Sequence, residues 1–334
     1  MQDTEYKGIN TQIRVAETKL FTREDYEKML RAEGLRGALD VLKGTDYYFD
    51  EQEVLDTKNF DQFLMARLKS VYDELFEMTP NREVVQIYTL RYSYHNLKVL
   101  LKQMLKEVEL EHLLIPIGNE SISTLRNLVQ TGQSEILDPI IVEAVQLTLE
   151  DHDTFERIEA IDVFMDTYYY KHIRAIADEL NNATISKVVD VMIDLDNLST
   201  VIRSLNQQKS RSFLHTVLSS SGSIAKQAII DAADQGKGAL SELYLSQPYA
   251  KDLDAILADS RSEISPMMLD RVIEEIIDDL MDEGKYQAFG PMPVVAYIFA
   301  IEKEITNIRL ILVGKDNQID EEILRERMRP IYGS

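Results

Sequence analysis

Few residue combinations in this chain match the spacings that phosphate or metal chemistry requires. A phosphate-binding loop needs an early glycine, then Gly-Lys and a hydroxyl residue after a strand, so that backbone N–H groups wrap the phosphates. Neither Val313–Asp316 nor Gly236–Gly238 has that spacing. Glu109 and His112 form one Glu-x-x-His pair, whereas a helical di-metal site needs two. The Asp-His-Asp triplet at 151–153 is more typical of a helix start than of a metal site.

The composition likewise gives no argument for an enzyme. The chain has five histidines and no cysteine, so a zinc site is unsupported and a disulfide framework is excluded. The absence of cysteine fits a reducing compartment. With 58 Asp and Glu residues, no general acid–base pair stands out. We therefore predict no catalytic residue, no cofactor and no metal, while a helical enzyme with an unrecognised site stays an alternative.

Three asparagines, Asn96, Asn197 and Asn307, recur at one position of three similar apolar patterns. The residues three before them are Ser93, Asp194 and Glu304, and those two after them are Lys98, Ser199 and Arg309. Glu304 and Asn307 lie on adjacent helical turns, so we expect a hydrogen bond between them. Asparagine is a poor interior helix residue, which suggests a polar packing contact; a merely exposed asparagine is the alternative.

Each asparagine lies in a predicted helix whose apolar residues recur every three or four positions. In the last helix, Pro293 suits the first turn and Gly314 suits the end. Two further helices are predicted at Tyr6–Phe21 and Thr154–Asn181. The apolar positions of the three asparagine helices are Ile87, Leu90, Tyr94, Leu97, Leu101 and Met104; Val188, Val191, Leu195, Leu198, Ile202 and Leu205; and Val294, Ile298, Ile301, Ile305, Ile308 and Leu312.

A second pattern precedes each asparagine helix and points to internal triplication. Leucines three apart, followed by Thr or Ser after three more residues, begin at Leu39, Leu125 and Leu240. The asparagines themselves are 101 and 110 residues apart, a domain-sized period. Two elements in the same order three times predict three similar helical domains, at 1–112, 113–216 and 217–334, with linkers near 113–119 and 219–223.

Fold class and surface charge follow from the same sequence. No convincing period-two strand pattern occurs, so the prediction is all-α. The net charge of −22 disfavours nucleic acid and anionic lipid as partners. The N-terminal sequence is polar, without the apolar segment of a signal peptide. The longest apolar run, Pro293–Ile301, is far shorter than the ~20 residues of a membrane span, so no direct membrane insertion is expected.

The whole chain resembles the C subunit (d in eukaryotes) of rotary V-type and A-type ATPases, in its shorter prokaryotic form. The residues that carry the resemblance lie, in order, in five segments that share short motifs: Tyr6-x-x-Ile9-Asn10-Thr11-x-Ile13-Arg14 with Leu20-Phe21, His95–Lys102, Asp194–Leu198, Glu302–Arg309, and Arg329-x-x-Tyr332. Each segment is weak alone, but their order and the chain length are specific.

The resemblance implies three similar helical domains arranged with pseudo-threefold symmetry as a funnel or cup. One face would sit on the proteolipid rotor ring (c or K subunits), and the open end would receive the central shaft, subunits D and F. The chain would be a non-catalytic rotor adaptor on the cytoplasmic face of the membrane, transmitting torque for transport of H⁺ or Na⁺. A helical scaffold unrelated to ATPases is the alternative.

The sequence departs from the family pattern at three places. Ser93 stands where the family has an acid, Ser199 where it has a basic residue, and Phe21 where it has an aliphatic residue. The candidates for structural or interface roles are Asn10, Arg14, Asn96, Lys98, Asp194, Asn197, Glu302, Glu304, Asn307 and Arg309. Polar contacts that fix helix packing within each domain are the favoured role for these residues, and interface contacts are the alternative.

Overall fold

The computed structural model describes residues 3–249, 253–257, 264–285 and 287–331. These residues form helices joined by short loops and include no strand, which confirms the all-α prediction. They group into two compact units: a middle unit, Gln86–Leu280, and a terminal unit made of the described parts of Gln2–Val85 and Met281–Ser334. The predicted boundaries after residues 112 and 216 stay predictions.

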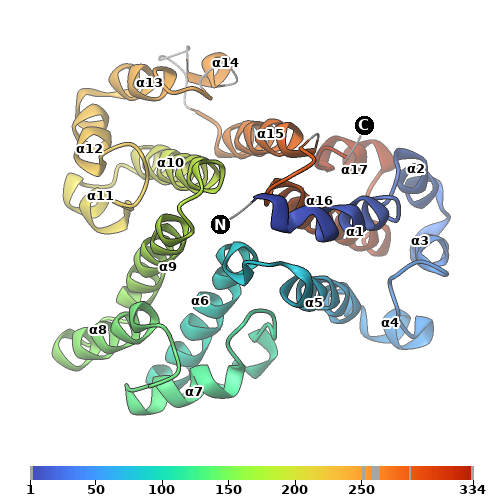
Figure 1. Cartoon of the computed structure of the whole chain (residues 1–334), viewed down its shortest axis with the longest axis horizontal. Coiled ribbons are helices and arrows are strands. Elements are labelled where there is room, and N and C mark those ends of the chain that lie inside the picture. The colour runs from blue at the N-terminus through green and yellow to red at the C-terminus, as the bar shows by residue number, and fades with distance from the viewer. Residues whose placement is uncertain (1–2, 250–252, 258–263, 286, 332–334) are drawn as a thin grey trace. The chain divides into compact units, whose positions relative to one another are not determined.

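The terminal unit joins helices from both ends of the sequence (Figure 1). Its core is α16, which contacts α1, α2, α3, α5 and α17. The helices of this unit are η1 (Asp3–Tyr6), α1 (Lys7–Glu17), α2 (Arg23–Arg31), α3 (Gly34–Leu42), α4 (Glu51–Thr57), α5 (Phe60–Met78), α16 (Met292–Asp316) and α17 (Glu321–Arg327).

The middle unit holds the other helices, and α6 and α15 each contain a boundary between the units. In it, α9 packs on α8 and α10, and α12 packs on α11 and α13. The helices are α6 (Arg82–Lys106), η2 (Glu111–Leu113), α7 (Ile122–Thr131), α8 (Pro139–Phe155), α9 (Glu159–Leu180), α10 (Ala183–Asn206), α11 (Arg211–Val217), α12 (Lys226–Gln235), α13 (Lys237–Leu245), α14 (Asp254–Leu257) and α15 (Pro266–Lys285).

The three asparagine helices are α6, α10 and α16, and their apolar stripes are buried as their spacing predicts. The stripe residues at the C-terminal ends of α6 and α10, Met104 and Leu205, are more exposed than the rest. In α16 all six stripe residues are at most 2% exposed, and Val295, Tyr297 and Ile311 on its other sides are buried too. Because α16 is buried on most of its sides and contacts five other helices, it forms the core of the terminal unit.

Three predicted helix boundaries are wrong for local reasons. Gly314 does not end α16: it is buried two residues before the end, where a Cβ would come within 2.3 Å of the Leu324 side chain. The predicted helix at 154–181 is interrupted because Glu156 caps α8 with a left-handed backbone, φ 53°. The first helix is α1, which ends at Glu17 rather than Phe21; the following Thr22 and Asp25 form a capping box for α2.

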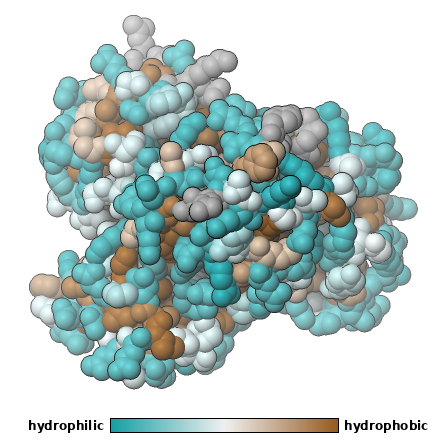
Figure 2. Space-filling view, viewed as in Figure 1, coloured by the Kyte–Doolittle hydropathy of each residue, from teal (hydrophilic) through white to brown (hydrophobic). Residues whose placement is uncertain are grey.

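Polar side chains cover most of the face drawn in Figure 2, with apolar patches between them. Among the described residues, no helix is long and apolar enough to span a membrane.

Candidate functional site

Each of the three asparagines forms the same pair of hydrogen bonds. The side-chain amide of Asn96 donates to the carbonyl of Ile115 (2.7 Å) and accepts from its N–H (2.8 Å). Asn197 does the same with Ser219, at 3.0 and 2.8 Å. Asn307 does so with Arg329, at 3.1 and 2.8 Å. We call this pair an asparagine staple, because it ties one turn of a helix to a backbone segment 19 to 22 residues further along.

The staples satisfy the amides of asparagines that are each only 1% exposed. A buried amide without a partner would cost about 1–3 kcal/mol. The hydrogen bond that the spacing suggested between Glu304 and Asn307 does not form: Asn307 bonds Arg329, and Glu304 bonds residues of the N-terminal segment. The motif that ends at Tyr332 lies partly outside the described residues, since Tyr332 is not among them.

Glu304 is a buried carboxylate of the terminal unit whose pKa lies well above its ordinary value. Its two oxygens accept hydrogen bonds from the backbone N–H of Phe21 (2.5 Å) and the hydroxyl of Tyr47 (2.6 Å). The side chain is 95% buried, beside a cavity of only about 10 Å³, which has room for about one water molecule. Burial raises the pKa of Glu304 to about 7, against the lowering effect of these two hydrogen bonds.

Asp194 occupies the matching position on α10. Its carboxylate accepts from the backbone N–H of Ile224 (3.1 Å) and the hydroxyl of Ser223 (2.5 Å). The hydroxyl of Tyr249 donates to the same carboxylate at 3.4 Å, as Tyr47 does to Glu304. Each of the two acids therefore binds the backbone of a segment outside its own helix: Glu304 binds it at Phe21, and Asp194 binds it at Ile224.

The first copy reaches the same arrangement with the residue types exchanged. Ser93 stands where an acid was expected, and its hydroxyl donates to the carboxylate of Glu120 at 2.5 Å. The acid is thus supplied by the segment rather than by the helix. Sequence comparison at the helix positions missed Glu120; its place just before the second Leu-x-x-Leu pattern was the only available signal.

Two of the three asparagines are followed, two positions later, by a basic residue that forms an ion pair with a neighbouring helix. Lys98 pairs with Asp166 of α9 at 2.5 Å, and Arg309 pairs with Asp61 of α5 at 2.5 Å. On α10, Ser199 replaces the basic residue, and Arg203, one turn later, pairs with Asp270 of α15 at 2.6 Å. These pairs are partly exposed, so each contributes little to stability. Each pair nevertheless shows which helix lies beside that asparagine helix.

The remaining candidates also have intramolecular partners. Asn10 is 5% exposed and donates to the backbone carbonyl of Gly290 at 3.1 Å, which ties α1 to the residues before α16. Arg14 pairs with Glu17 of its own helix at 2.8 Å. Glu302 accepts from the hydroxyl of Tyr72 on α5 at 2.5 Å.

These contacts follow one cyclic order in the sequence. The basic side of α6 contacts the helix that precedes α10, that of α10 contacts the helix that precedes α16, and that of α16 contacts the helix that precedes α6. The residues three positions before the asparagines likewise each hold a segment outside their own helix: Ser93 holds the one with Glu120, Asp194 the one with Ile224, and Glu304 the N-terminal one with Phe21. The last of the three asparagine helices, α16, therefore takes its partners from the beginning of the chain.

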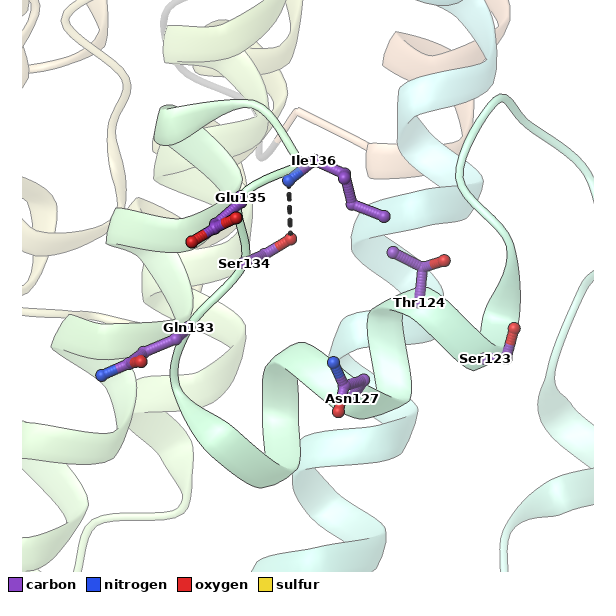
Figure 3. A pocket seen from close by; sticks show the side chains of 7 residues that line it. All are labelled: Ser123, Thr124, Asn127, Gln133, Ser134, Glu135 and Ile136. Atoms are coloured by element: carbon purple, nitrogen blue, oxygen red, sulfur yellow. Dashed lines mark hydrogen bonds between the residues drawn. The ribbon is translucent and has the colours of Figure 1, made fainter.

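The described residues offer little for catalysis. They contain no group of three or more His, Asp or Glu side chains placed to hold a metal ion. A hollow of about 520 Å³ between α7 and the loop after it is lined by seven side chains, among them Glu135 and the exposed Ile136 (Figure 3). Glu135 is the one titratable group of that lining, so the hollow provides no acid–base pair.

Comparisons with known proteins match this chain over nearly its whole length. The family model described as ATP synthase (C/AC39) subunit matches residues 9–327. The C subunit of the V-type sodium ATPase of Enterococcus hirae is 29% identical over 98% of this chain and 99% of its own length. The C subunit of the A-type ATP synthase of Methanocaldococcus jannaschii is 24% identical over 96% of this chain and 85% of its own length.

Proposed function

The chain belongs to the ATP synthase (C/AC39) subunit family, and from that premise we propose that it is the rotor adaptor of a V-type or A-type ATPase. The family is a structural rather than a catalytic part of such ATPases, so the partners of this chain are other ATPase subunits. In the proposed role it joins the central shaft, subunits D and F, to the proteolipid ring (c or K subunits). It transmits torque between ATP turnover and the movement of H⁺ or Na⁺.

The cyclic order of the staples and ion pairs is the observation that carries this proposal. Three copies of one helical arrangement, the last closed by the first segment of the chain, are the construction expected of a body with pseudo-threefold symmetry around a shaft. Close-packed helices deform little, which suits a part that must pass torque. Peripheral attachment on the cytoplasmic side, through the complex, belongs to the same proposal.

Purification of the ATPase from membranes tests the adaptor role. The affinity-tagged full chain should bring the proteolipid ring and the shaft subunits out of detergent-solubilised membranes. A complex assembled without the chain should keep ATP hydrolysis in its catalytic head but lose ion transport. Recovery of the chain alone, or transport unchanged without it, would contradict the adaptor role and favour an unrelated scaffold.

A further inference from the structure

A groove runs between α1 and α5 in the terminal unit. Both helices pack on α16, and the space between them, about 570 Å³, has Tyr297 of α16 among its lining residues. The lining extends over residues 12–16 of α1, Lys19 just after that helix, and residues 63–78 of α5. At 1.5 Å per residue the two helical stretches are about 6 and 22 Å long. The longer wall, on α5, thus has the length of a helix of about four turns.

The groove contains more hydrogen-bond donors than acceptors at one end. Arg67 is only 13% exposed on its side chain, and its one partner among the described residues is Asp46, at 3.2 Å. Its Nε atom is buried with no hydrogen bond. Lys19 contacts the same Asp46 at 3.4 Å. The hydroxyl of Tyr297, a side chain 4% exposed, forms no hydrogen bond within the described part of the chain. Arg67, Lys19 and Tyr297 are therefore three hydrogen-bond donors at this end of the groove, and Asp46 is the one carboxylate that contacts any of them within the described residues.

The opposite charge lies further along the same wall. Glu74 is two turns from Arg67 on α5, about 10 Å away, and accepts a hydrogen bond from Ser70 at 3.3 Å. The groove is therefore basic at one position and acidic two turns later. A segment that fits it would place an acidic residue near Arg67 and a basic residue near Glu74.

Large apolar side chains on the lining are left in water. Val15 is 62% exposed, Tyr48 is 82% exposed and Met78 is 38% exposed. Val15 and Met78 belong to the two facing helices, and Tyr48 to the loop before α4. A small molecule within the cavity would leave much of these side chains uncovered, whereas a helix lying along the groove covers them together.

We propose that the groove between α1 and α5 is a docking site for an amphipathic helix of another subunit of the same ATPase. The apolar face of that helix covers Val15, Tyr48 and Met78. An Asp or Glu on it accepts hydrogen bonds from Arg67 and Tyr297, and a Lys or Arg two turns away pairs with Glu74. This proposal rests on the proposed function in one respect only: the docked helix is assigned to a subunit of the ATPase because this chain is proposed to belong to that complex.

Single cysteines test the proposal, because the chain has none of its own. Val15→Cys and Met78→Cys should react readily with a maleimide in the isolated chain. Their reaction should be at least tenfold slower in the ATPase purified from membranes. Ile136→Cys, in the other unit and 80% exposed, is the matched control for general shielding by the complex.

The outcomes separate this proposal from the proposed function. Equal reactivity at positions 15 and 78 in the free and assembled chain, while the chain still co-purifies with the ATPase, overturns the groove alone. Failure of the chain to co-purify overturns the ATPase role. A benzophenone attached at position 15 should cross-link to a helical segment carrying Asp or Glu; an adduct with lipid or with a second copy of this chain contradicts the proposed occupant.

Tyr297→Phe tests the polar part of the groove without disturbing the fold. The hydroxyl that it removes has no partner within the described residues, so the melting temperature should stay unchanged. Loss of one hydrogen bond to the docked helix should weaken binding of the chain to the rest of the ATPase about fivefold. Unchanged binding would contradict the hydrogen bond from Tyr297.

Discussion

Glu304 makes stability depend on pH near neutrality. Burial raises its pKa from 4.5 to about 7 in the folded chain, so the folded state binds more protons than the unfolded state between these values. The contribution of Glu304 to stability is therefore full below pH 4.5 and is lost as the pH rises through about 7. The loss amounts to about 3 kcal/mol at most.

We expect Glu304→Gln to remove this pH dependence. The free energy of unfolding of the unaltered chain should decline between about pH 5 and 7.5, as measured by urea denaturation at several pH values. The decline should be clearly smaller in Glu304→Gln, because glutamine does not titrate. The exposed Glu326→Gln is the control for a change of one charge; identical pH profiles for all three proteins would show that Glu304 ionises normally.

We expect Asn307→Ala to lower the stability of the chain, and to affect binding of partner subunits only as a consequence. It removes both hydrogen bonds that join the buried Asn307 to the backbone of Arg329, at a cost of about 1–3 kcal/mol. Denaturation measures the loss, and Asn127→Ala, an exposed helical asparagine, should change stability by less than about 0.5 kcal/mol. If Asn307→Ala melted normally but no longer bound the shaft, the interface role would replace the staple.

Sequence could identify the stapling residues but not their partners. Asn96, Asn197 and Asn307 stand out because asparagine is unusual inside a helix. Their partners are backbone groups, which any residue type provides, so no pattern marks them. The roles of Glu120 and Arg203 could not be predicted, because neither residue stands at the position where the other copies carry their charge. The structure shows that Glu120 bonds Ser93 and that Arg203 forms the ion pair expected at position 199.

At the level of elements, Gly314 sets how closely α17 approaches α16. A Cβ at this position would lie 2.3 Å from one methyl carbon of Leu324 and 2.7 Å from the other. We expect Gly314→Ala to destabilise the chain by about 1–3 kcal/mol, because the fully buried Leu324 side chain, or α17 with it, must shift. Adding Leu324→Ala should recover part of the loss from Gly314→Ala, which a double-mutant cycle measures.

Gly8→Ala is the matched control, since a Cβ on this helical glycine meets nothing within 4 Å. It should stabilise the chain by about 0.5–1 kcal/mol through the better helix propensity of alanine. If Gly314→Ala stabilised the chain as Gly8→Ala does, α17 would not lie against α16 as described.

The long helices were predictable and their ends were less so. The stripes of α6, α10 and α16 are long and periodic, and each is buried. Gly314 was misread as a helix end because close helix packing and a helix stop both favour glycine. The break at Glu156 was missed because glutamate carries no signal for a left-handed backbone.

At the level of the whole molecule, the repeated patterns predict triplication, which stays a prediction, but they do not predict which distant parts of the chain come into contact. The sequence placed each Leu-x-x-Leu element ahead of an asparagine helix. In the structure, α3, which carries Leu39, packs on α16, and the hydroxyl of Tyr244 on α13 bonds the backbone of Asp194 on α10. The order of motifs along the sequence does not tell which distant segments come into contact when the chain folds.

The charge of −22 predicts salt-sensitive assembly. An acidic surface attracts basic partner surfaces over a distance that salt shortens. Binding of the shaft subunits to the full chain should therefore weaken, chiefly through a slower association rate, between about 50 and 500 mM salt. An affinity and association rate independent of salt would show that the acidic surface takes no part in assembly.

Rotation of this chain within the working ATPase tests the adaptor role most directly. A gold particle attached to Ile136→Cys, the single cysteine of an otherwise cysteine-free chain, would report its movement in complexes immobilised through the catalytic head. We expect the particle to turn in one direction when ATP is added and to stop when ATP is removed. A particle that stays still while the same complexes hydrolyse ATP and transport ions would contradict the account.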